Sequence, residues 1–419
     1  MRRLKPTAAA LALVGASVAF ALGAAEALLR LFPGLMPEAA QLRIHWQDLS
    51  EPVTQADPYL GHVYPANHVD QIERPGGDFA FTYTTDEHGF RNPSPWPDRA
   101  DIVVLGDSMA FGYGVEDDET WTALLADWLS GTRIINLGLI GAAPQQYLRI
   151  YERYGQALQP DLVLFCLFPG NDVHDAERFD EWVKAGAETD YRLWRRGAGS
   201  AGAMSSLRRL REQSYLINLL RSARSRALSS FGGRTIDFPD GGRLQLAPAV
   251  YARNERLAQP DHPNFGLVLE AVEQARALAE QGDSEFLVLL VPTKEKVYLP
   301  LLDEPQPEVI APFLDAFDKA GIPYLDLTPH LQASARQGER LYFEVDGHPN
   351  AAGYRRIAQV VFEHLRQSCQ GAGAPTPAHG RALDRQSTRD ASAGDGCFVR
   401  SGDGGDPPAE AATDGHRGE

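Results

Sequence analysis

The sequence has few cysteines and no dense run of basic residues. Only 3 cysteines occur among 419 residues, and no two of them have the C-x-x-C spacing of a thiolate metal site or redox motif. The 40 Lys and Arg residues are outnumbered by 56 Asp and Glu residues, so the net charge is −16. Because a nucleic-acid-binding protein needs a basic face to displace counterions, the acidic balance argues against nucleic acid as a partner.

The chain does have enough apolar residues to fold. Hydrophobic residues make up 43% of it and aromatic residues 9%, which excludes wholesale disorder. Cys166 lies in an apolar run and is expected to be a small buried side chain. Cys369 lies at the start of a Gly-rich C-terminal segment and Cys397 lies within it. These two cysteines imply no disulfide framework.

The amino terminus carries an uncharged apolar stretch, residues 7–25, behind Arg2, Arg3 and Lys5. This stretch is long enough to cross a hydrocarbon core of about 30 Å. Basic residues before it predict a cytoplasmic amino terminus and a remainder outside the cytoplasm, on the periplasmic side of the inner membrane. A cleaved signal peptide is the rival interpretation, because small residues around positions 21–27 offer cleavage sites. The length of the apolar run favours an uncleaved anchor over residues 1–32.

From residue 101 onward, short apolar runs alternate with amphipathic stretches. Such runs are typical of strands buried on both faces, and their alternation with helices predicts an α/β fold with a doubly wound parallel sheet of about five strands. The expected strands are 102–105, 134–137, 162–168, 286–291 and 322–327. The expected helices are 120–129, 144–157, 267–281 and one that begins near Ala351.

Three further segments flank or interrupt this domain, which we place at 101–368. Residues 33–100 are expected to form an arm packed on it, with one short strand at 79–83. Residues 176–260 are expected to be an insertion with a basic amphipathic helix at 205–228 and a hairpin at 235–248. The basic face suits either solvent or a membrane surface, and both interpretations remain open. Residues 369–419 are rich in Gly and Pro and are expected to be disordered.

Polar residues follow the ends of several expected strands. Ligands of open parallel sheets bind outside the carboxyl ends of the strands, where Gly106-Asp107-Ser108 exposes a hydroxyl. A phosphate-binding loop is disfavoured because the segment has neither G-x-G-x-x-G nor a Lys-Ser/Thr ending. Taken alone, Ser108 could also be an ordinary helix N-cap. The next strand ends supply Gly141 and Asn171, whose backbone and side-chain N–H groups can form an oxyanion hole.

The four motifs together resemble those of the SGNH/GDSL hydrolase family. The first reads Gly-Asp-Ser108-x-x-x-Gly, and the others match at Gly141, at Gly170-Asn171-Asp172 and at Asp346 and His348. Two departures occur: Asp346 precedes His348 by two positions where the family more often has D-x-x-H, and Phe168 replaces a Gly. The closer spacing is similar to that of membrane-anchored, alginate-acetyltransferase-like members. The resemblance implies a flavodoxin-like sheet and a serine esterase or acyltransferase.

The residue chemistry and the resemblance imply a role for each residue. Ser108 is the expected nucleophile, His348 the general base, and Asp346 the group that orients the imidazole. The backbone N–H groups of Ser108 and Gly141 and the side chain of Asn171 are the expected oxyanion donors. No cofactor and no metal is required.

We therefore expect a membrane-anchored serine hydrolase of carboxylic esters, with O-acetylated glycan as the expected substrate. One alternative is an O-acyltransferase that modifies a cell-envelope polysaccharide, and a second is a non-catalytic glycan-binding or assembly module. Lys294, Glu295 and Lys296 follow the fourth strand; they either contact substrate or, as we favour, are solvated charges. A metal site around His88 has little support, because adjacent side chains do not converge.

Overall fold

The fold is described from a computed structural model of the protein. The residues described are 6–36, 52–74, 78–188, 190–195, 214–220, 234–246, 252–304 and 308–370. Contacts divide the chain into two compact units, and each is treated by itself: residues 1–51, 73–77 and 192–232 form one, and residues 52–72, 78–191 and 233–419 form the other.

The larger unit is built on a sheet of five parallel strands: β5 (Ile102–Gly106), β6 (Ile134–Gly138), β7 (Leu162–Leu167), β10 (Glu285–Leu290) and β11 (Tyr324–Asp326). Their spatial order is β11-β10-β7-β5-β6. Numbered along the chain, this is the flavodoxin-like order 2-1-3-4-5, which confirms the predicted fold class. The strand order reverses between β5 and β7, so this is the switch point where a ligand site is expected.

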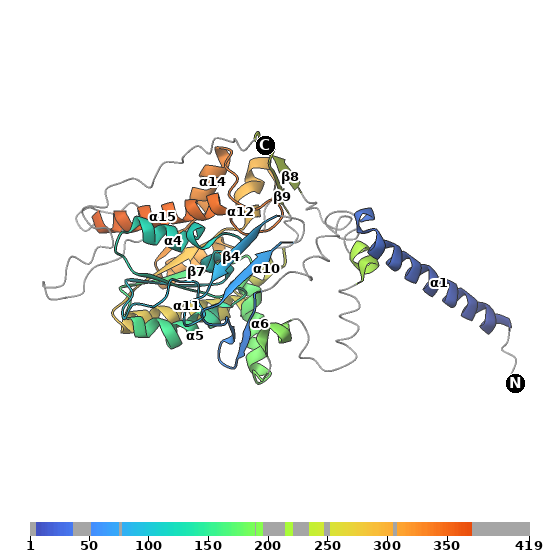
Figure 1. Ribbon diagram of the computed structural model, residues 1–419, viewed down its shortest axis with the longest axis horizontal. Helices are drawn as coiled ribbons and strands as arrows, with labels where there is room; N and C mark the ends of the chain where they lie inside the picture. The colour runs from blue at the N-terminus through green and yellow to red at the C-terminus, as the bar shows by residue number, and fades with distance from the viewer. Residues whose placement is uncertain are drawn as a thin grey trace. The chain divides into compact units, whose positions relative to one another are not determined.

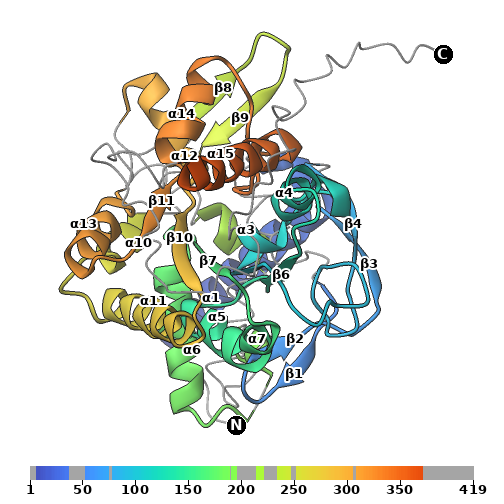
Figure 2. The same cartoon turned by 90° about the vertical axis from the view of Figure 1, so that its left-hand side faces the viewer.

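Helices cover both faces of the sheet, as Figure 2 shows. Val103 and Leu105 of β5 belong to the apolar cluster that includes α5 (Pro144–Ile150) and α11 (Pro263–Gln281), whereas Ile102 and Val104 belong to the cluster that includes α4 (Trp121–Trp128) and α15 (Ala351–Gln370). Successive residues of a strand point to opposite faces of the sheet. When helices cover both faces, the residues on each face must therefore be apolar. Cys166 lies in β7 with 1% of its surface exposed, as expected.

The other helices of this unit connect or flank the strands. They are α3 (Ser108–Phe111), α6 (Asp172–Lys184), α10 (Ala252–Leu257), α12 (Lys294–Tyr298), α13 (Ala311–Ala320) and α14 (Thr328–Arg336). A further helix, α7 (Tyr191–Arg195), has only its first residue in this unit. The helix expected at 144–157 changes pitch: α5 continues as a π-helical turn at Tyr151–Gly155 and a 3₁₀ turn at Gln156–Leu158. Short 3₁₀ turns also occur at Asp117–Glu119 and Leu299–Leu302.

Two small antiparallel sheets precede the central sheet. β1 (Gln55–Asp57) pairs with β2 (Gly61–Val63), and β3 (Val69–Glu73) pairs with β4 (Ala80–Thr84), which lies one residue beyond the strand expected at 79–83. Tyr64 and Tyr83 pack their rings on Phe111 of α3, with centroids 5.6 and 5.2 Å away. The residues between 52 and 100 therefore contact the helix that begins with Ser108.

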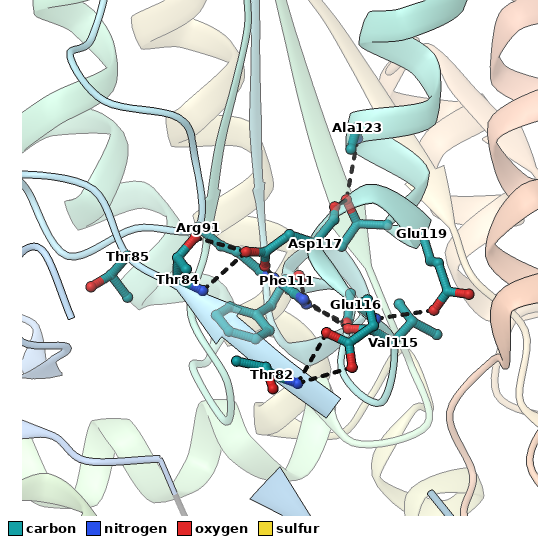
Figure 3. Close-up of polar contacts among 12 residues, drawn as sticks. Thr82, Thr84, Thr85, Arg91, Phe111, Val115, Glu116, Asp117, Glu119 and Ala123 are labelled. Carbon is teal, nitrogen blue, oxygen red and sulfur yellow. Dashed lines mark hydrogen bonds and ion pairs between the residues drawn. The ribbon is translucent and has the colours of Figure 1, made fainter. Parts of the chain in front are cut away.

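Arg91 links the same segment to the loop after α3 (Figure 3). Its buried guanidinium donates to the carbonyls of Gly112 and Val115, each at 2.7 Å, and to Asp117 at 2.6 Å. Beside it, the carboxylate of Glu116 accepts from the N–H of Thr82 in β4. A buried cation that satisfies several carbonyls fixes their relative positions, so Arg91 holds the loop after α3 in place.

The insertion is only partly described. Its expected start at 176 falls inside α6, and of the expected helix 205–228 only 214–220 lie within the described residues. The expected hairpin is present as β8 (Arg234–Asp237) paired with β9 (Arg243–Leu246), and Gly241 in its turn has φ +81°. The expected disordered tail lies outside the described residues apart from positions 369 and 370, which extend α15.

The smaller unit contains α1 (Pro6–Leu31, Figure 1) and a 3₁₀ turn at Pro33–Leu35. Within α1, the segment Leu13–Leu31 is long and apolar enough to cross a membrane, and 6% of the most apolar part of it is buried. A membrane anchor and a signal sequence both have these properties.

Candidate active site

Ser108 is the first residue of α3, immediately after β5. Asp107 caps this helix, because its Oδ1 accepts from the backbone N–H of Met109 at 2.8 Å. The alternative in which Ser108 is itself the N-cap is therefore wrong. The turn before Ser108 has room only for a glycine at position 106, because a Cβ there would lie 2.6 Å from the Cβ of Ala110 and 2.9 Å from that of Cys166. The local sequence thus sets the Ser108 hydroxyl at the carboxyl end of β5.

His348 bridges Ser108 and Asp346. Its Nε2 lies 2.8 Å from Ser108 Oγ, and its Nδ1 lies 2.5 Å from Asp346 Oδ1. The same Oδ1 accepts from the backbone N–H of His348 at 2.9 Å. The two-residue spacing therefore suits the pair, because one carboxylate oxygen meets both the N–H and the ring of His348. Tyr113 packs against the imidazole with a centroid distance of 4.7 Å.

Asn171 approaches the serine from the end of β7, one residue before α6. Its Nδ2 donates to Asp107 Oδ2 at 3.0 Å. A side-chain amide carries two N–H donors, so this bond orients the group and leaves the second N–H for another acceptor. The preceding turn is packed tightly, since a Cβ on Gly170 would lie 2.6 Å from the ring of Phe168.

Asp172 holds the turn at residues 168–171 through two hydrogen bonds. It accepts from the N–H of Phe168 and from the hydroxyl of Tyr147, both at 2.6 Å. Burial raises its pKa well above the ordinary value, and the nearby carboxylate of Asp107 adds to the effect. Burial likewise raises the pKa of Asp107. Asp107 and Asp172 are therefore two buried carboxyl groups that influence one another, and neither belongs to the Asp346–His348 pair.

Gly141 lies in the turn between β6 and α5 with φ +70°, a conformation that favours glycine. The neighbouring residue Ile140 is held from the arm: its N–H donates to the hydroxyl of Tyr64, and its carbonyl lies 3.2 Å from His62 Nε2. The role of Gly141 as an oxyanion donor stays a prediction.

Lys294, Glu295 and Lys296, which follow β10, were expected to be solvated charges, and this expectation was wrong for the first two. Lys294 is 1% exposed and Glu295 is 2% exposed, so neither is a solvated charge. Lys294 Nζ donates to four consecutive backbone carbonyls, those of residues 343–346, at 3.0–3.3 Å. Lys296 pairs with Glu308. The buried residues of α12 are Lys294, Glu295, Val297 and Tyr298. The apolar residues Val297 and Tyr298 lie three and four positions after Lys294, so they share a helix face with it, and this spacing is the signal in the sequence that Lys294 points inward.

Residues that the sequence did not single out hold the predicted ones. Asp78 accepts from the N–H groups of Val345 and Asp346, and Asn254 of α10 donates to the carbonyl of Gly170. Their partners lie far away along the chain, so no local pattern reveals them. Among the described residues, no group of three or more His, Cys, Asp or Glu side chains is arranged to hold a metal ion.

Comparison with known proteins decides the family. A sequence model of the GDSL-like Lipase/Acylhydrolase family matches residues 104–356, which is more than half of the chain. The chain belongs to this family. The expected class of enzyme, an esterase of the GDSL type, is thereby confirmed. The likeness to the alginate-acetyltransferase-like branch stays a prediction. No curated protein matched the chain.

Solved structures of this family are similar to the chain at low identity. They include a member of the lipolytic protein G-D-S-L family from Veillonella parvula (15% identity, 62% of this chain and 96% of that one, TM-score 0.34). A catalytic mutant of an acetylxylan esterase from Geobacillus stearothermophilus has 13% identity over 64% of this chain and 95% of that one, with a TM-score of 0.30. An aryl esterase of M. smegmatis has 13% identity over 64% and 99%, with a TM-score of 0.32. Values this low carry no argument about substrate or residue roles.

Proposed function

We propose that this GDSL-type enzyme cleaves carboxylic esters through a Ser108–His348–Asp346 triad and an acyl-enzyme intermediate. The observation that carries the proposal is the unbroken chain of contacts from Asp346 Oδ1 to His348 Nδ1 and from His348 Nε2 to Ser108 Oγ. A nucleophile and its base within hydrogen-bond reach, with the base oriented by a third group, is the arrangement that acyl transfer needs.

The reaction proceeds in two halves. His348 takes the proton of Ser108 as its oxygen attacks the ester carbonyl, and it then gives that proton to the departing alcohol. Water next attacks the acyl-enzyme, with His348 accepting a proton from it, and the acid leaves as Ser108 regains its proton. Asp346 accepts from the N–H of Nδ1, so the neutral imidazole carries its proton on the nitrogen away from Ser108 and Nε2 is free to act as the base. The same carboxylate stabilises the imidazolium that forms.

The negative oxygen of each tetrahedral intermediate needs donors that are already in place. We assign this role to the N–H groups of Ser108 and Gly141 and to the second side-chain N–H of Asn171. The bond from Asn171 to Asp107 supports this assignment, because it holds the amide rigid before the substrate arrives.

We further propose that the enzyme acts outside the cytoplasm, on O-acetyl esters of a glycan, while α1 holds it on the periplasmic side of the inner membrane. The apolar segment Leu13–Leu31 and the basic residues at the amino terminus support the location. The short spacing of Asp346 and His348, which resembles that of acetyltransferase-like members, supports acetyl as the acyl group.

The test compares the full chain in detergent with its Ser108→Ala variant, using p-nitrophenyl acetate with and without an acetyl-accepting oligosaccharide. Ser334→Ala is the matched control, because Ser334 is as buried as Ser108 and lies on α14. We expect nitrophenol release that is lost in Ser108→Ala and kept in Ser334→Ala. Equal release from all three proteins would overturn the proposal. Acetylated oligosaccharide among the products would instead identify an O-acyltransferase that uses the same triad.

A further inference from the structure

The loop that carries the acid and base of the triad has almost no regular structure of its own. Residues 343–348 lie between α14 and α15, and a single bridge joins Tyr342 to Pro349 on either side of them. One backbone bond ties them to β9, from the N–H of Gln245 to the carbonyl of Glu344. We propose that Lys294 and Asp78 form a two-sided clamp on this loop and are positioning residues for Asp346 and His348. This inference rests on the proposed function and adds two residues, one of them from the arm, to its machinery.

Lys294 holds the carbonyl side of the loop. Its Nζ lies 3.0 Å from the carbonyl oxygens of Val345 and Asp346, 3.2 Å from that of Glu344 and 3.3 Å from that of Phe343. An ammonium group has three N–H donors and no acceptor, so at least one N–H is shared between two of the four carbonyl oxygens. A cage of carbonyl oxygens is a suitable environment for such a group when water is excluded. Four successive carbonyls can face one point only if the loop curls around the Lys294 ammonium group.

Asp78 holds the amide side of the same loop. Its Oδ2 accepts from the N–H of Asp346 at 2.6 Å and from that of Val345 at 3.1 Å. Asp78 precedes β4 and is partly buried. Val345 and Asp346 therefore have both their N–H and their C=O groups bound to a charged side chain from a distant segment. Hydrogen bonds to charged groups are stronger than neutral ones, so these contacts fix the backbone of Asp346.

The position of this backbone decides the position of the imidazole. Asp346 Oδ1 meets both the N–H and Nδ1 of His348, so a shift of Asp346 moves the ring that faces Ser108. Displacement of a catalytic group by about 1 Å, caused by a change away from the reacting atoms, can reduce turnover about 100-fold. A clamp that acts through position predicts a fall in kcat with little change in KM, because neither Lys294 nor Asp78 is assigned a contact with substrate.

The test uses the full chain in detergent and the variants Lys294→Met and Asp78→Ala. Lys296→Met is the matched control, since it removes a lysine of the same helix that pairs with Glu308 and not with the loop. Two properties are measured: kcat and KM for p-nitrophenyl acetate, and amide hydrogen exchange of the peptide spanning 341–348. The exchange measurement does not depend on activity. Asp78→Ala keeps the test decisive if the buried Lys294→Met variant does not fold.

We expect kcat to fall about 10- to 100-fold in both variants, with KM within about two-fold of the unaltered enzyme and faster exchange confined to the loop. Lys296→Met should match the unaltered enzyme. The double variant should lose less than the product of the two single losses, because both residues hold one element. Unchanged exchange would overturn the clamp, and faster exchange with unchanged kcat would overturn the positioning role. A lack of Ser108-dependent turnover in the unaltered enzyme would overturn the proposed function instead, and exchange alone would then decide whether the loop is clamped.

Discussion

The two sides of the candidate site are constructed in different ways. On the nucleophile side, Ser108 and Asn171 follow β5 and β7, which pair in parallel from Ile102 and Leu162 to Gly106 and Cys166. Regular backbone hydrogen bonds therefore set their separation. On the acid–base side, Asp346 and His348 lie in a loop that is held by side chains from distant segments. The first side is fixed by the sheet, and the second by a small number of charged contacts together with one backbone bond, from the N–H of Gln245 in β9 to the carbonyl of Glu344.

This difference predicts where the site is most easily damaged. A single substitution on the nucleophile side leaves the strand pairing intact, so it should remove one donor or acceptor and little else. A substitution in the acid–base loop removes a contact for which no regular structure substitutes. The predictions that follow test this contrast, from the largest expected effect to the smallest.

Asp346→Asn should cause the largest loss. The amide can donate to Nδ1 and favour the wrong tautomer of His348, a change that lowers kcat about 10⁴-fold in a serine protease. We expect about 10³-fold or more in kcat for p-nitrophenyl acetate, with KM little changed. Glu344→Gln, which removes a carboxylate two residues away, is the control. A similar loss in both variants would mean that charge in the loop, and not the pairing with His348, is what matters.

Asn171→Ala tests the nucleophile side. Loss of one oxyanion donor lowers turnover about 10²- to 10³-fold in other enzymes, and we expect a fall of this size in kcat. Folding should persist, because the backbone of the turn is still held by Asp172 through the N–H of Phe168. A thermal melt measured alongside the kinetics separates the two effects. Turnover within about two-fold of the unaltered enzyme would remove Asn171 from the oxyanion hole.

Much of the nucleophile side could be predicted from sequence, for a physical reason. The apolar run before Ser108, the glycine at 106 and the polar residue that follows each strand are local features, and the parallel sheet places them at one edge. The strand predictions were accurate to within about two residues because strands buried on both faces need unbroken apolar runs.

The supports of the acid–base loop could not be predicted in this way. Lys294 was expected to be a solvated charge, since a lysine after a strand is most often exposed. Its burial depends on four carbonyls that lie about 50 residues further along the chain. The N–H groups that bind Asp78 lie still further from it along the chain. Such partners follow from the tertiary fold and not from local spacing. The sequence therefore predicts which residues are the acid and the base, but it does not predict the residues that hold them.

Asn254→Ala should have a smaller effect than the two substitutions above. Asn254 of α10 donates to the carbonyl of Gly170, next to Asn171, so it supports the proposed oxyanion donor from the far end of the insertion. Because Asp107 and Asp172 still hold the turn, we expect kcat to fall only about 3- to 10-fold. Gln259→Ala, just beyond the same helix, is the control. A loss as large as that of Asn171→Ala would show that the insertion, and not the sheet, positions the amide.

Asp172→Asn should change the pH dependence of stability more than it changes turnover. Burial raises the pKa of Asp172, so the folded protein keeps a proton at pH values where the unfolded chain, with a pKa near 3.8, has lost it. The folded state then binds more protons than the unfolded state, and the free energy of unfolding falls as pH rises above the unfolded value.

The Asp172→Asn variant cannot ionise at this position, so it lacks this decline, whose slope is at most about 1.4 kcal/mol per pH unit for one group. In urea unfolding, its stability relative to the unaltered protein should rise as the pH is raised above about 3.8, the pKa in the unfolded chain. Asp180→Asn, at an accessible position on the same helix, is the control. A relative gain no larger than that of Asp180→Asn would mean that Asp172 is ionised in the folded protein. The nucleophile side would then also be held by a buried charged side chain, as the acid–base side is held by Lys294. The two sides would in that case differ less in how they are held in place.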